Sequence, residues 1–417
     1  MSAPQWNALA LPLETPFLEW EWLNHLETSG SAIARTGWLP RHLTLWRGNT
    51  LVAAAPLYLK GHSYGEFVFD HQWAELAYRL GEPYYPKLVG MTPFTPAVGY
   101  RFLVAEGETG VNELFLEAID QFCQGEGISS CHFLFADPQW SEAIVPLGWH
   151  RWLHHHYLWQ NHHYQSFEDY LAHFNANQRR NIKRERQAVQ KAGLQMHTVH
   201  GAEIPEHFLN VMYDLYSHTC DRFLWGSKYL TRQFFQGLHR DYRHRLLFSV
   251  ATTAQGGNEP VGMAFCITKN QQLYGRYWGA WQEVDSLHFE TCYYTPIAWA
   301  IERGIQTFDP GAGGRHKKRR GFWATPNFSL HRFYTQRLGA ILPEYIHQTN
   351  EYTIQEIQAI NENIPLKAAP PQTNVAGMTL SPEENRESQV SGWIASSSTS
   401  KYRVALGGIT PPAPRAP

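Results

Sequence analysis

The sequence has no long hydrophobic run and almost no net charge. Within its 417 residues, no apolar stretch approaches the roughly 18 residues that a membrane helix requires. Residues 1–16 also lack the basic start and apolar stretch of a signal peptide, so we expect no membrane span and a cytoplasmic protein. The formal net charge of -2 provides no overall field that would attract nucleic acid or an acidic membrane. Any polyanion must therefore be held by a local patch.

The sequence also lacks the motifs of metal, redox and nucleophilic sites. It contains no C-x-x-C pair, no G-x-S-x-G, no H-E-x-x-H and no recognisable Ser-His-Asp spacing. A run of histidines at 154–156 alternates between the two faces of a predicted strand, so we expect no metal site. The few cysteines are scattered, and we expect all of them to be reduced: Cys123, Cys131, Cys220, Cys266 and Cys292.

Two segments of the chain follow the same pattern. Each begins with Gly-Asn-x-x-Val, at residues 48–52 and 257–261, and in both a lysine follows the valine after eight residues. A Gly-Asn pair before an apolar run is typical of a hairpin turn. We therefore predict strands at 51–59 and 66–69 in the first copy, and at 261–268 and 273–278 in the second.

Each predicted hairpin is followed by a helix and another strand. The first copy has these at 111–123 and 128–135, and the second at 293–302 and 305–308. The pattern predicts an α/β fold of mixed sheets, repeated in tandem. The other interpretation is two unrelated α/β domains. We place the domains at 1–158 and 159–365, followed by a Pro- and Ser-rich tail at 366–417 that we expect to be mostly disordered.

A glycine-rich loop followed by a dense basic run, residues 311–320, is the most informative stretch. Glycines let backbone N–H groups approach a ligand, and lysine and arginine supply charge, so the combination suits a phosphate or pyrophosphate. The residues that we assign to this phosphate site are Gly311, Gly313, His316, Lys317 and Arg320. A flexible basic surface loop fits the same residues. The spacing matches neither a P-loop nor a dinucleotide fingerprint.

Two further segments carry groups that can act in chemistry. On a predicted helix, Arg179, Lys183 and Arg186 recur at spacings that give one cationic face, suited to an RNA backbone or a phosphorylated substrate, or simply to solvent. After the second hairpin, His288 and Glu290 are candidates to accept a proton from an attacking amine. A structural histidine and a carboxylate that compensates a helix dipole are the alternatives.

The first copy contains an aromatic, proline-rich surface with two cations, Lys87 and Arg101. This surface is suited to lining a cleft, although aromatic side chains also pack in cores. In the second copy, the aromatic strand that contains Arg276 and Trp278, and Tyr294 beyond it, are the corresponding candidates for substrate contact.

These segments together resemble the Fem-like family of peptidoglycan biosynthesis/recognition proteins, which is related to the Fem-type aminoacyltransferases and, more distantly, to the GNAT acyltransferases. The resemblance covers roughly residues 15 to 345. It is carried by residues 16–18, 62–67, 84–88, 93–96, 159–161, 184–186, 225–226, 274–279, 288–294 and 311–317. It implies two GNAT-like folds with a substrate cleft between them, and transfer of an acyl or aminoacyl group to an amine of a phosphorylated, wall-precursor-like substrate.

In this scheme Glu290 or His288 handles the proton, and Arg276 and Lys87 position or polarise the substrate. Two residues depart from the family pattern, Arg315 in the glycine-rich loop and Leu158 before Trp159. The sequence also departs from the pattern with which GNAT proteins usually bind the pyrophosphate of coenzyme A, because Ala280 and Trp281 follow Arg276-x-x-Gly279. We expect no bound cofactor. Acyl-coenzyme A and aminoacyl-tRNA are the possible donor substrates, and the sequence favours aminoacyl-tRNA or no donor at all. A non-catalytic recognition module and an RNA-binding protein are the alternative functions.

Overall fold

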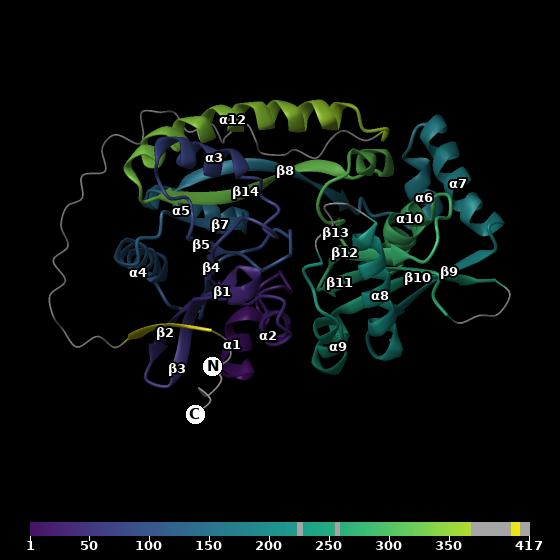
Figure 1. Cartoon of the computed structure of the whole chain (residues 1–417). Coiled ribbons are helices and arrows are strands. Elements are labelled where there is room, and N and C mark those ends of the chain that lie inside the picture. The colour runs from purple at the N-terminus through teal and green to yellow at the C-terminus, as the bar shows by residue number, and fades with distance from the viewer. Residues whose placement is uncertain (223–227, 255–258, 368–401, 409–417) are drawn as a thin grey trace.

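The computed structural model describes residues 1–222, 228–254, 259–367 and 402–408. Figure 1 shows two α/β halves side by side, joined by one long sheet that runs through both. We call the part with α1 to α5 and β1 to β7 the first half, and the part with α6 to α11 and β9 to β13 the second half. No described helix is both long enough and apolar enough to cross a membrane.

The larger sheet has 11 strands in the order β1-β4-β5-β7-β14-β8-β13-β12-β11-β10-β9. Their bounds are β1 (Trp38–Pro40), β4 (Tyr58–Lys60), β5 (Lys87–Gly90), β7 (Ser130–Ala136), β8 (His150–Gln160), β9 (Leu194–His200), β10 (Leu246–Thr253), β11 (Gly262–Lys269), β12 (Gln272–Ala280), β13 (Thr307–Asp309) and β14 (Trp323–Phe333). A smaller sheet contains β15 (Arg403–Gly407), β2 (His42–Arg47), β3 (Thr50–Ala55) and β6 (Leu103–Val104).

Helices cover both sheets, and α12 lies across the top of the first half in Figure 1. The helices are α1 (Ala3–Ala10), α2 (Trp20–Thr28), α3 (His71–Leu80), α4 (Val111–Gly125), α5 (Pro138–Ile144), α6 (Phe167–Ala172), α7 (Ala176–Lys191), α8 (His207–Asp221), α9 (Arg232–Asp241), α10 (Leu287–Phe289), α11 (Thr295–Glu302) and α12 (Gln336–Glu362). A π-helical turn, η5 (Glu290–Tyr294), joins α10 to α11, and a 3-10 helix, η6 (Arg315–Arg320), follows the glycine-rich loop. The other short turns are η1 (Ala34–Thr36), η2 (Val145–Leu147), η3 (Gly201–Glu203) and η4 (Arg243–Arg245).

The sheet repeats one arrangement in its two halves. In the first half β5 pairs antiparallel with β4 and parallel with β7, and in the second half β12 pairs antiparallel with β11 and parallel with β13. The fold class expected from the sequence, mixed α/β sheets repeated in tandem, is therefore confirmed. The strand predicted at 66–69 is wrong, because residues 61–70 form a loop and β5 takes the place beside β4. The turn at Gly257–Asn258 lies outside the described residues.

The halves share strands rather than meeting at a clean boundary. β14 follows the second half in sequence, yet it pairs with β7 of the first half on one side and with β8 on the other. β8 in turn pairs with β13 of the second half. The boundary predicted at residue 158 falls inside β8, so backbone hydrogen bonds continue across it. The tail predicted to be mostly disordered contains one described strand, β15, which pairs with β2; residues 368–401 and 409–417 lie outside the described residues.

The parallel strand pairs of the two halves end differently. Pairing between β5 and β7 ends at Gly90 and Phe133, and Tyr100 packs there so closely that a Cβ atom on Gly90 would lie 2.3 Å from its hydroxyl oxygen. The Tyr100 hydroxyl donates to the carbonyl oxygen of Pro56 at 2.9 Å. The chain's own aromatic side chain therefore fills this point in the first half.

Because Tyr100 is fully packed at this point, we expect Tyr100→Ala to lower the free energy of unfolding by about 3–5 kcal/mol, the usual cost of removing a buried aromatic ring. Urea unfolding followed by circular dichroism measures this change. Tyr78→Ala is the matched control, since Tyr78 is 85% exposed and its loss should leave the urea midpoint unchanged. Equal effects of the two substitutions would contradict the packing role of Tyr100.

Candidate functional site

A cavity of about 230 Å³ lies in the second half, at the point where β12 and β13 part. The last parallel pair is Tyr274 with Asp309, and beyond it the chain after β13 turns away as the glycine-rich loop. The cavity is lined by Ala264, Phe265, Cys266, Gly275, Arg276, Tyr277, Trp278, His288, Cys292, Tyr293, Pro310, Gly311, Ala312, Gly313, Gly314, His316 and Lys317. Seven of the residues predicted from the sequence are in this set: Arg276, Trp278, His288, Gly311, Gly313, His316 and Lys317.

An ion pair spans the gap between the parting strands. A shift of register between Phe265 and Cys266 marks a bulge between β11 and β12, opposite Arg276. The Arg276 guanidinium lies 3.5 Å from a carboxylate oxygen of Asp309, and both side chains are nearly inaccessible to solvent. The Arg276 Nε has no hydrogen-bond partner. Arg276 therefore faces the cavity as a fixed charge with an unused donor.

The glycine-rich loop wraps around Lys317. The other carboxylate oxygen of Asp309 accepts from the backbone N–H of Gly311 at 2.7 Å, and the Lys317 ammonium donates to the carbonyl oxygens of Gly311 and Ala312 at 2.6 and 3.1 Å. Gly311 has φ 81° and lies against the carbonyl of Gly275, so a side chain there would be strained and crowded. Burial lowers the pKa of Lys317 to about 8, although the nearby Asp309 opposes the shift. Lys317 is thus charged at neutral pH and neutral in mild alkali.

Two uncharged imidazoles form another wall of the cavity. The ring of His288 lies against Trp278 with centroids 4.5 Å apart, and His316 shares a hydrogen bond with the Tyr293 hydroxyl at 2.9 Å. Burial lowers the pKa of His288 to about 4, helped by His316, Arg320 and Lys317. Burial and the same two cations lower the pKa of His316 to about 4. Both imidazoles are therefore available as proton acceptors at neutral pH.

The two cysteines that line the cavity are thiols rather than thiolates. Burial raises the pKa of Cys266 to about 12, with Arg276 opposing the shift, and burial also raises the pKa of Cys292 well above its ordinary value. Since the thiolate is the nucleophilic form, neither side chain is activated for covalent catalysis.

Three predicted site residues lie behind the cavity wall. Glu290 accepts from the Arg186 Nε at 3.1 Å and from the Thr295 hydroxyl at 3.1 Å. Tyr294 donates to Glu185, which also pairs with Arg320 at 2.8 Å. Arg320 stacks on the ring of Phe289 at 3.4 Å. These side chains tie α7 to η5 and η6, so the geometry gives Glu290, Tyr294 and Arg320 supporting positions.

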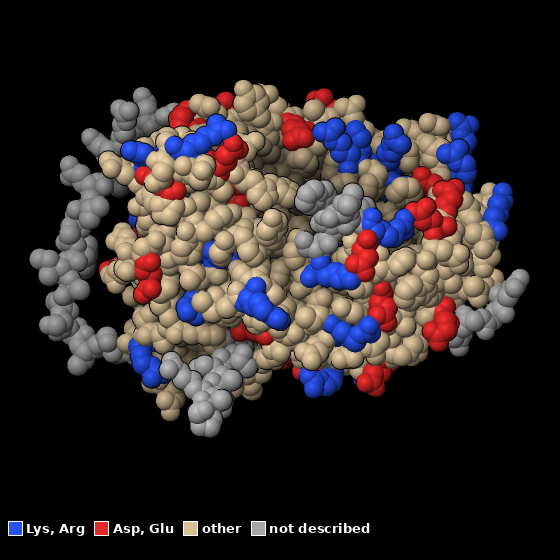
Figure 2. Space-filling model, in the orientation of Figure 1, with Lys and Arg blue, Asp and Glu red and all other residues tan. Residues whose placement is uncertain are grey.

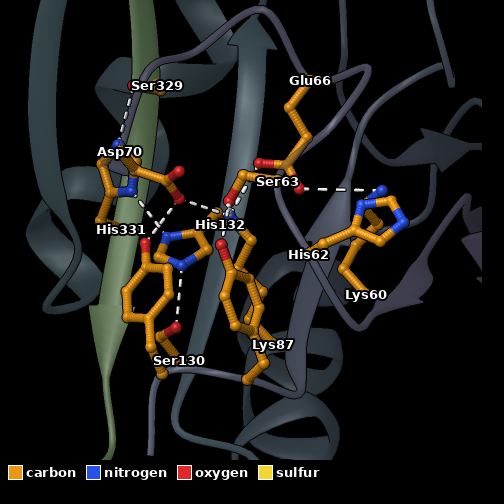
Figure 3. A network of polar contacts seen from close by, with 12 residues as sticks. Lys60, His62, Ser63, Glu66, Asp70, Lys87, Ser130, His132, Ser329 and His331 are labelled. Carbon is orange, nitrogen blue, oxygen red and sulfur yellow. Dashed lines mark hydrogen bonds and ion pairs between the residues drawn. The ribbon is translucent and has the colours of Figure 1, made fainter. Parts of the chain in front are cut away.

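Lys87 lies in a separate network, which Figure 3 shows in the first half. Its ammonium donates to Ser63 at 2.8 Å, to Glu66 at 2.7 Å and to Asp70, and Lys87 is fully buried. Neighbouring groups complete the network through Tyr84, Tyr85, Ser130, His132, Ser329 and His331. All three ammonium hydrogens of Lys87 have acceptors within the protein, so Lys87 does not reach the cavity.

Arg101 lines a second cavity, of about 550 Å³. Tyr274 and Asp309 line the second cavity, while the next residues along the chain, Gly275 and Pro310, line the first. Residues from both halves enclose it: Pro12, Leu13, Glu14, Thr15, Val98, Gly99, Arg101, Asp137, Pro138, Gln139, His156, Leu158, Gln272, Leu273, Tyr274, Thr307, Asp309, Thr325 and Pro326. The Arg101 Nε is buried and has no partner. The Arg276–Asp309 ion pair therefore joins a residue that lines the first cavity to a residue that lines the second.

The predicted cationic helix face is only partly exposed. Arg186 turns inward to Glu290, and Arg179 donates to the carbonyl of Phe174 at 3.2 Å. The exposed cations of α7 are Arg180, Lys183, Arg184 and Lys191. Figure 2 shows Lys and Arg side chains gathered over α7 at the upper right, and a hollow near the top centre of the same face.

Several residues of the site were not expected from the sequence. Tyr277 and Tyr293 lie inside stretches that the sequence singles out. Asp309 ends a strand just before the glycine-rich loop, which is a position typical of functional groups. Ser63, Glu66 and Asp70 surround Lys87 but follow no recognisable spacing. Within residues 1–222, 228–254, 259–367 and 402–408, no group of three or more His, Cys, Asp or Glu is placed to hold a metal ion.

Comparison with known proteins gives one family and a set of similar folds. The FemAB-like family model, described as peptidoglycan biosynthesis/recognition, matches residues 1–368. Curated proteins give no match. FemX is similar in structure, with 12% sequence identity and a TM-score of 0.51, over 82% of this chain and 98% of FemX.

Two further solved structures are similar at lower scores. L-PGS from Bacillus licheniformis has 12% identity and a TM-score of 0.46, over 79% of this chain and 96% of that one. A tandem GNAT protein from the clavulanic acid biosynthesis pathway has 12% identity and a TM-score of 0.37, over 76% and 94%.

We expect anion binding in the first cavity to depend on the charge of Lys317. Sulfate is a useful probe because it does not titrate near neutrality. Since Lys317 loses its proton as pH rises through about 8, affinity for sulfate should fall about tenfold between pH 7 and pH 9. Isothermal titration calorimetry at each pH measures the affinity for sulfate.

Lys317→Arg should abolish this pH dependence, because a guanidinium stays charged throughout the range. Lys318→Arg is the matched control, since Lys318 is the adjacent lysine and does not line the cavity. A pH-dependent loss of sulfate binding that persists in Lys317→Arg would assign the titration to another group.

Proposed function

This chain belongs to the FemAB-like family, and from that premise we propose that it is an N-acyl or aminoacyl transferase. Its acceptor is an amine of a phosphorylated, cell-wall-precursor-like substrate, and its place of action is the cytoplasm. The observation that carries the proposal is the buried Arg276–Asp309 pair at the parted strands β12 and β13, which links a residue that lines one cavity to a residue that lines another. A group transfer needs two reactants brought together, and this arrangement provides two binding spaces whose walls are joined by one ion pair.

The cations of the site suit the charges that acyl transfer creates. As the amine nitrogen attacks the acyl carbonyl carbon, the carbonyl oxygen becomes an oxyanion. Arg276 and Lys317 line the cavity and stabilise that charge. Gly311 and Gly313 allow the loop backbone to approach an anionic group of either substrate.

The neutral imidazole of His288 is the group that carries the proton from the amine to the leaving group. The amine loses a proton to His288 as the new C–N bond forms, and the imidazolium then returns it to the leaving oxygen or sulfur atom as the old acyl bond breaks. His316, held by Tyr293, lies beside His288 with ring centroids 5.8 Å apart and is the second acceptor in reach of the cavity. Glu290 is removed from this role by its bonds to Arg186 and Thr295.

Direct transfer to the amine needs no enzyme nucleophile. This agrees with the protonated thiols of Cys266 and Cys292. Acyl-coenzyme A and aminoacyl-tRNA remain the two donor classes in the proposal. The exposed cations of α7 favour a donor with a nucleic-acid body, because such a surface neutralises phosphates.

Arg101 supports an acceptor with an anionic group in the second cavity. Its Nε is buried without a partner, and the cavity opens between the two halves. A phosphate or carboxylate of the precursor would satisfy that donor. Lys87, by contrast, is saturated within its own network and is left out of substrate binding.

The proposal is tested by incubating the purified chain with radiolabelled acyl-coenzyme A or charged tRNA and a panel of amine acceptors, including wall precursors. We expect label to appear on an acceptor, and His288→Asn to lower the rate at least about 100-fold, the typical contribution of a general base. His207→Asn is the matched control, because His207 is exposed on α8 and should leave the rate unchanged.

Binding of a precursor without transfer from any donor would replace the enzyme by a recognition module. RNA binding that falls steeply with added salt, in the absence of both precursor binding and transfer, would instead indicate an RNA-binding protein.

A further inference from the structure

Lys60 and Glu66 face each other in the network of Figure 3 without a hydrogen bond between them. The Lys60 Nζ lies 3.9 Å from the Glu66 Oε1, which has no hydrogen-bond partner although Glu66 is only 1% exposed. Lys60 itself makes one hydrogen bond, to the carbonyl of Tyr64 at 3.1 Å, and lies over the ring of Trp38 at 3.5 Å. The pair is therefore buried and incompletely satisfied, an arrangement that is costly in a protein interior.

The other charged groups of the network are fixed. Lys87 pairs with the second oxygen of Glu66 and with Asp70. Burial lowers the pKa of Lys87, but Glu66 and Asp70 outweigh burial and the pKa is raised overall. Burial raises the pKa of Asp70, but Lys87 outweighs it and the pKa is lowered overall. This pair stays ionised near neutral pH.

The remaining titratable neighbours stay neutral. Burial lowers the pKa of His62, which lies beside Lys60, and lowers the pKa of His132 and of His331 well below the ordinary value. Burial raises the pKa of both Tyr84 and Tyr85. Charge changes near neutrality are thus confined to Lys60 and Glu66.

Both members of this pair titrate at the same pH. Burial lowers the pKa of Lys60 to about 7, against the attraction of Glu66, and burial raises the pKa of Glu66 to about 7, against the attraction of Lys87. Below pH 7 the network of two lysines and two acids carries one net positive charge, since Glu66 is protonated. Above pH 7 it carries one net negative charge, since Lys60 is neutral.

A short chain of aromatic contacts leads from Glu66 to the first cavity. Phe67 follows Glu66 and packs against Tyr229 with ring centroids 6.1 Å apart, and Phe94 stacks on the same Tyr229 at 5.0 Å. The Tyr277 hydroxyl donates to the carbonyl oxygen of Phe94 at 3.1 Å, and Tyr277 lines the cavity. The loop that carries the buried acid therefore touches the cavity wall through a few rings.

Phe67 and Phe94 also carry backbone strain. Their φ angles are 58° and 59°, in a region that residues with a large side chain rarely adopt. Such conformations persist only where the surroundings enforce them, and they are frequent in segments that switch between two arrangements.

We propose that Lys60 and Glu66 form a two-proton site that switches loop 61–70 between two packings and, through Phe67, Phe94 and Tyr277, sets the shape of the first cavity. The protons are the ligand, and the strained aromatic residues are the bistable element. The consequence for catalysis rests on the proposed transferase function, but the movement of the loop and of β12 does not.

The test is amide hydrogen exchange of the full chain, read by mass spectrometry from pH 6 to pH 8 and corrected for the chemical effect of pH. In the wild type we expect exchange in residues 61–70 and in β12 to change at least about threefold, with a shared midpoint near pH 7. Glu66→Gln should remove the transition in both segments. Exchange in the wild type that follows only the chemical rate, or a transition unchanged in Glu66→Gln, would overturn the proposal.

Tyr277→Phe tests the coupling without disturbing the buried charges. It removes the hydroxyl that bonds to Phe94. Loop 61–70 should keep its transition near pH 7 while β12 loses it. A transition that survives in β12 would show that the aromatic chain does not carry the switch. Because exchange is measured without substrate, failure of the transfer assay leaves this result standing.

The pH dependence of the protein's stability gives a second readout. The folded state holds an extra proton on Glu66 between the ordinary value of 4.5 and about 7, so this group's contribution falls as pH rises through that range. Lys60 releases its proton early, between about 7 and 10.5, so its contribution rises there. Together they give a minimum near pH 7.

Lys60→Met combined with Glu66→Gln removes both titrations. The difference in urea midpoint, double variant minus wild type, should therefore be largest near pH 7 and smaller at pH 5 and pH 9. A difference that is constant across this range would show that the pair does not titrate near neutrality and would overturn the proposal. Carbon-13 NMR of the wild-type glutamate carboxyls checks the same point, since one should titrate near pH 7.

Discussion

The parting of β12 and β13 beyond Tyr274 and Asp309 is the constraint on which the candidate site depends. Parallel strands that stay paired leave no room between them, whereas strands that separate leave backbone groups and side chains facing an open space. The Arg276–Asp309 ion pair bridges that space, and Asp309 also holds the start of the glycine-rich loop through the Gly311 N–H. Both cavities, the cationic wall and the position of Lys317 follow from this one separation.

The two halves share one strand arrangement but differ in what occupies the space beyond their paired parallel strands. Where β5 and β7 part, Tyr100 fills the space and bonds to Pro56. Where β12 and β13 part, glycines take the equivalent place and the space stays open. The first half instead gathers its charged groups around Lys87, at the other end of β5. The repeated strand arrangement thus accounts for the architecture, and the halves differ in whether a large side chain fills the space beyond the paired strands.

Local signals in the sequence were sufficient for much of the fold and part of the site. The second hairpin, the helix at 111–123 and the glycine-rich loop follow from turn residues and periodicity, which act over a few residues. The return of β14 to the first half did not follow, because strand pairing across the chain leaves no local mark. The same holds for Glu290, whose position close behind the second hairpin suggested catalysis. Its partner Arg186 is more than a hundred residues away and turns it from the cavity.

The continuous sheet has a mechanical consequence. β8 and β14 lie next to each other in the middle of the sheet; β8 also pairs with a strand of the second half, and β14 with a strand of the first. The 11 strands therefore form one continuous sheet that connects the two halves. Reactants of different sizes must then be admitted by rotation of side chains and movement of loops at the rim, because the halves cannot swing apart without breaking strand hydrogen bonds. The framework is stiff and its surface adapts. Such a molecule holds the distance between its two binding spaces constant while it exchanges what occupies them.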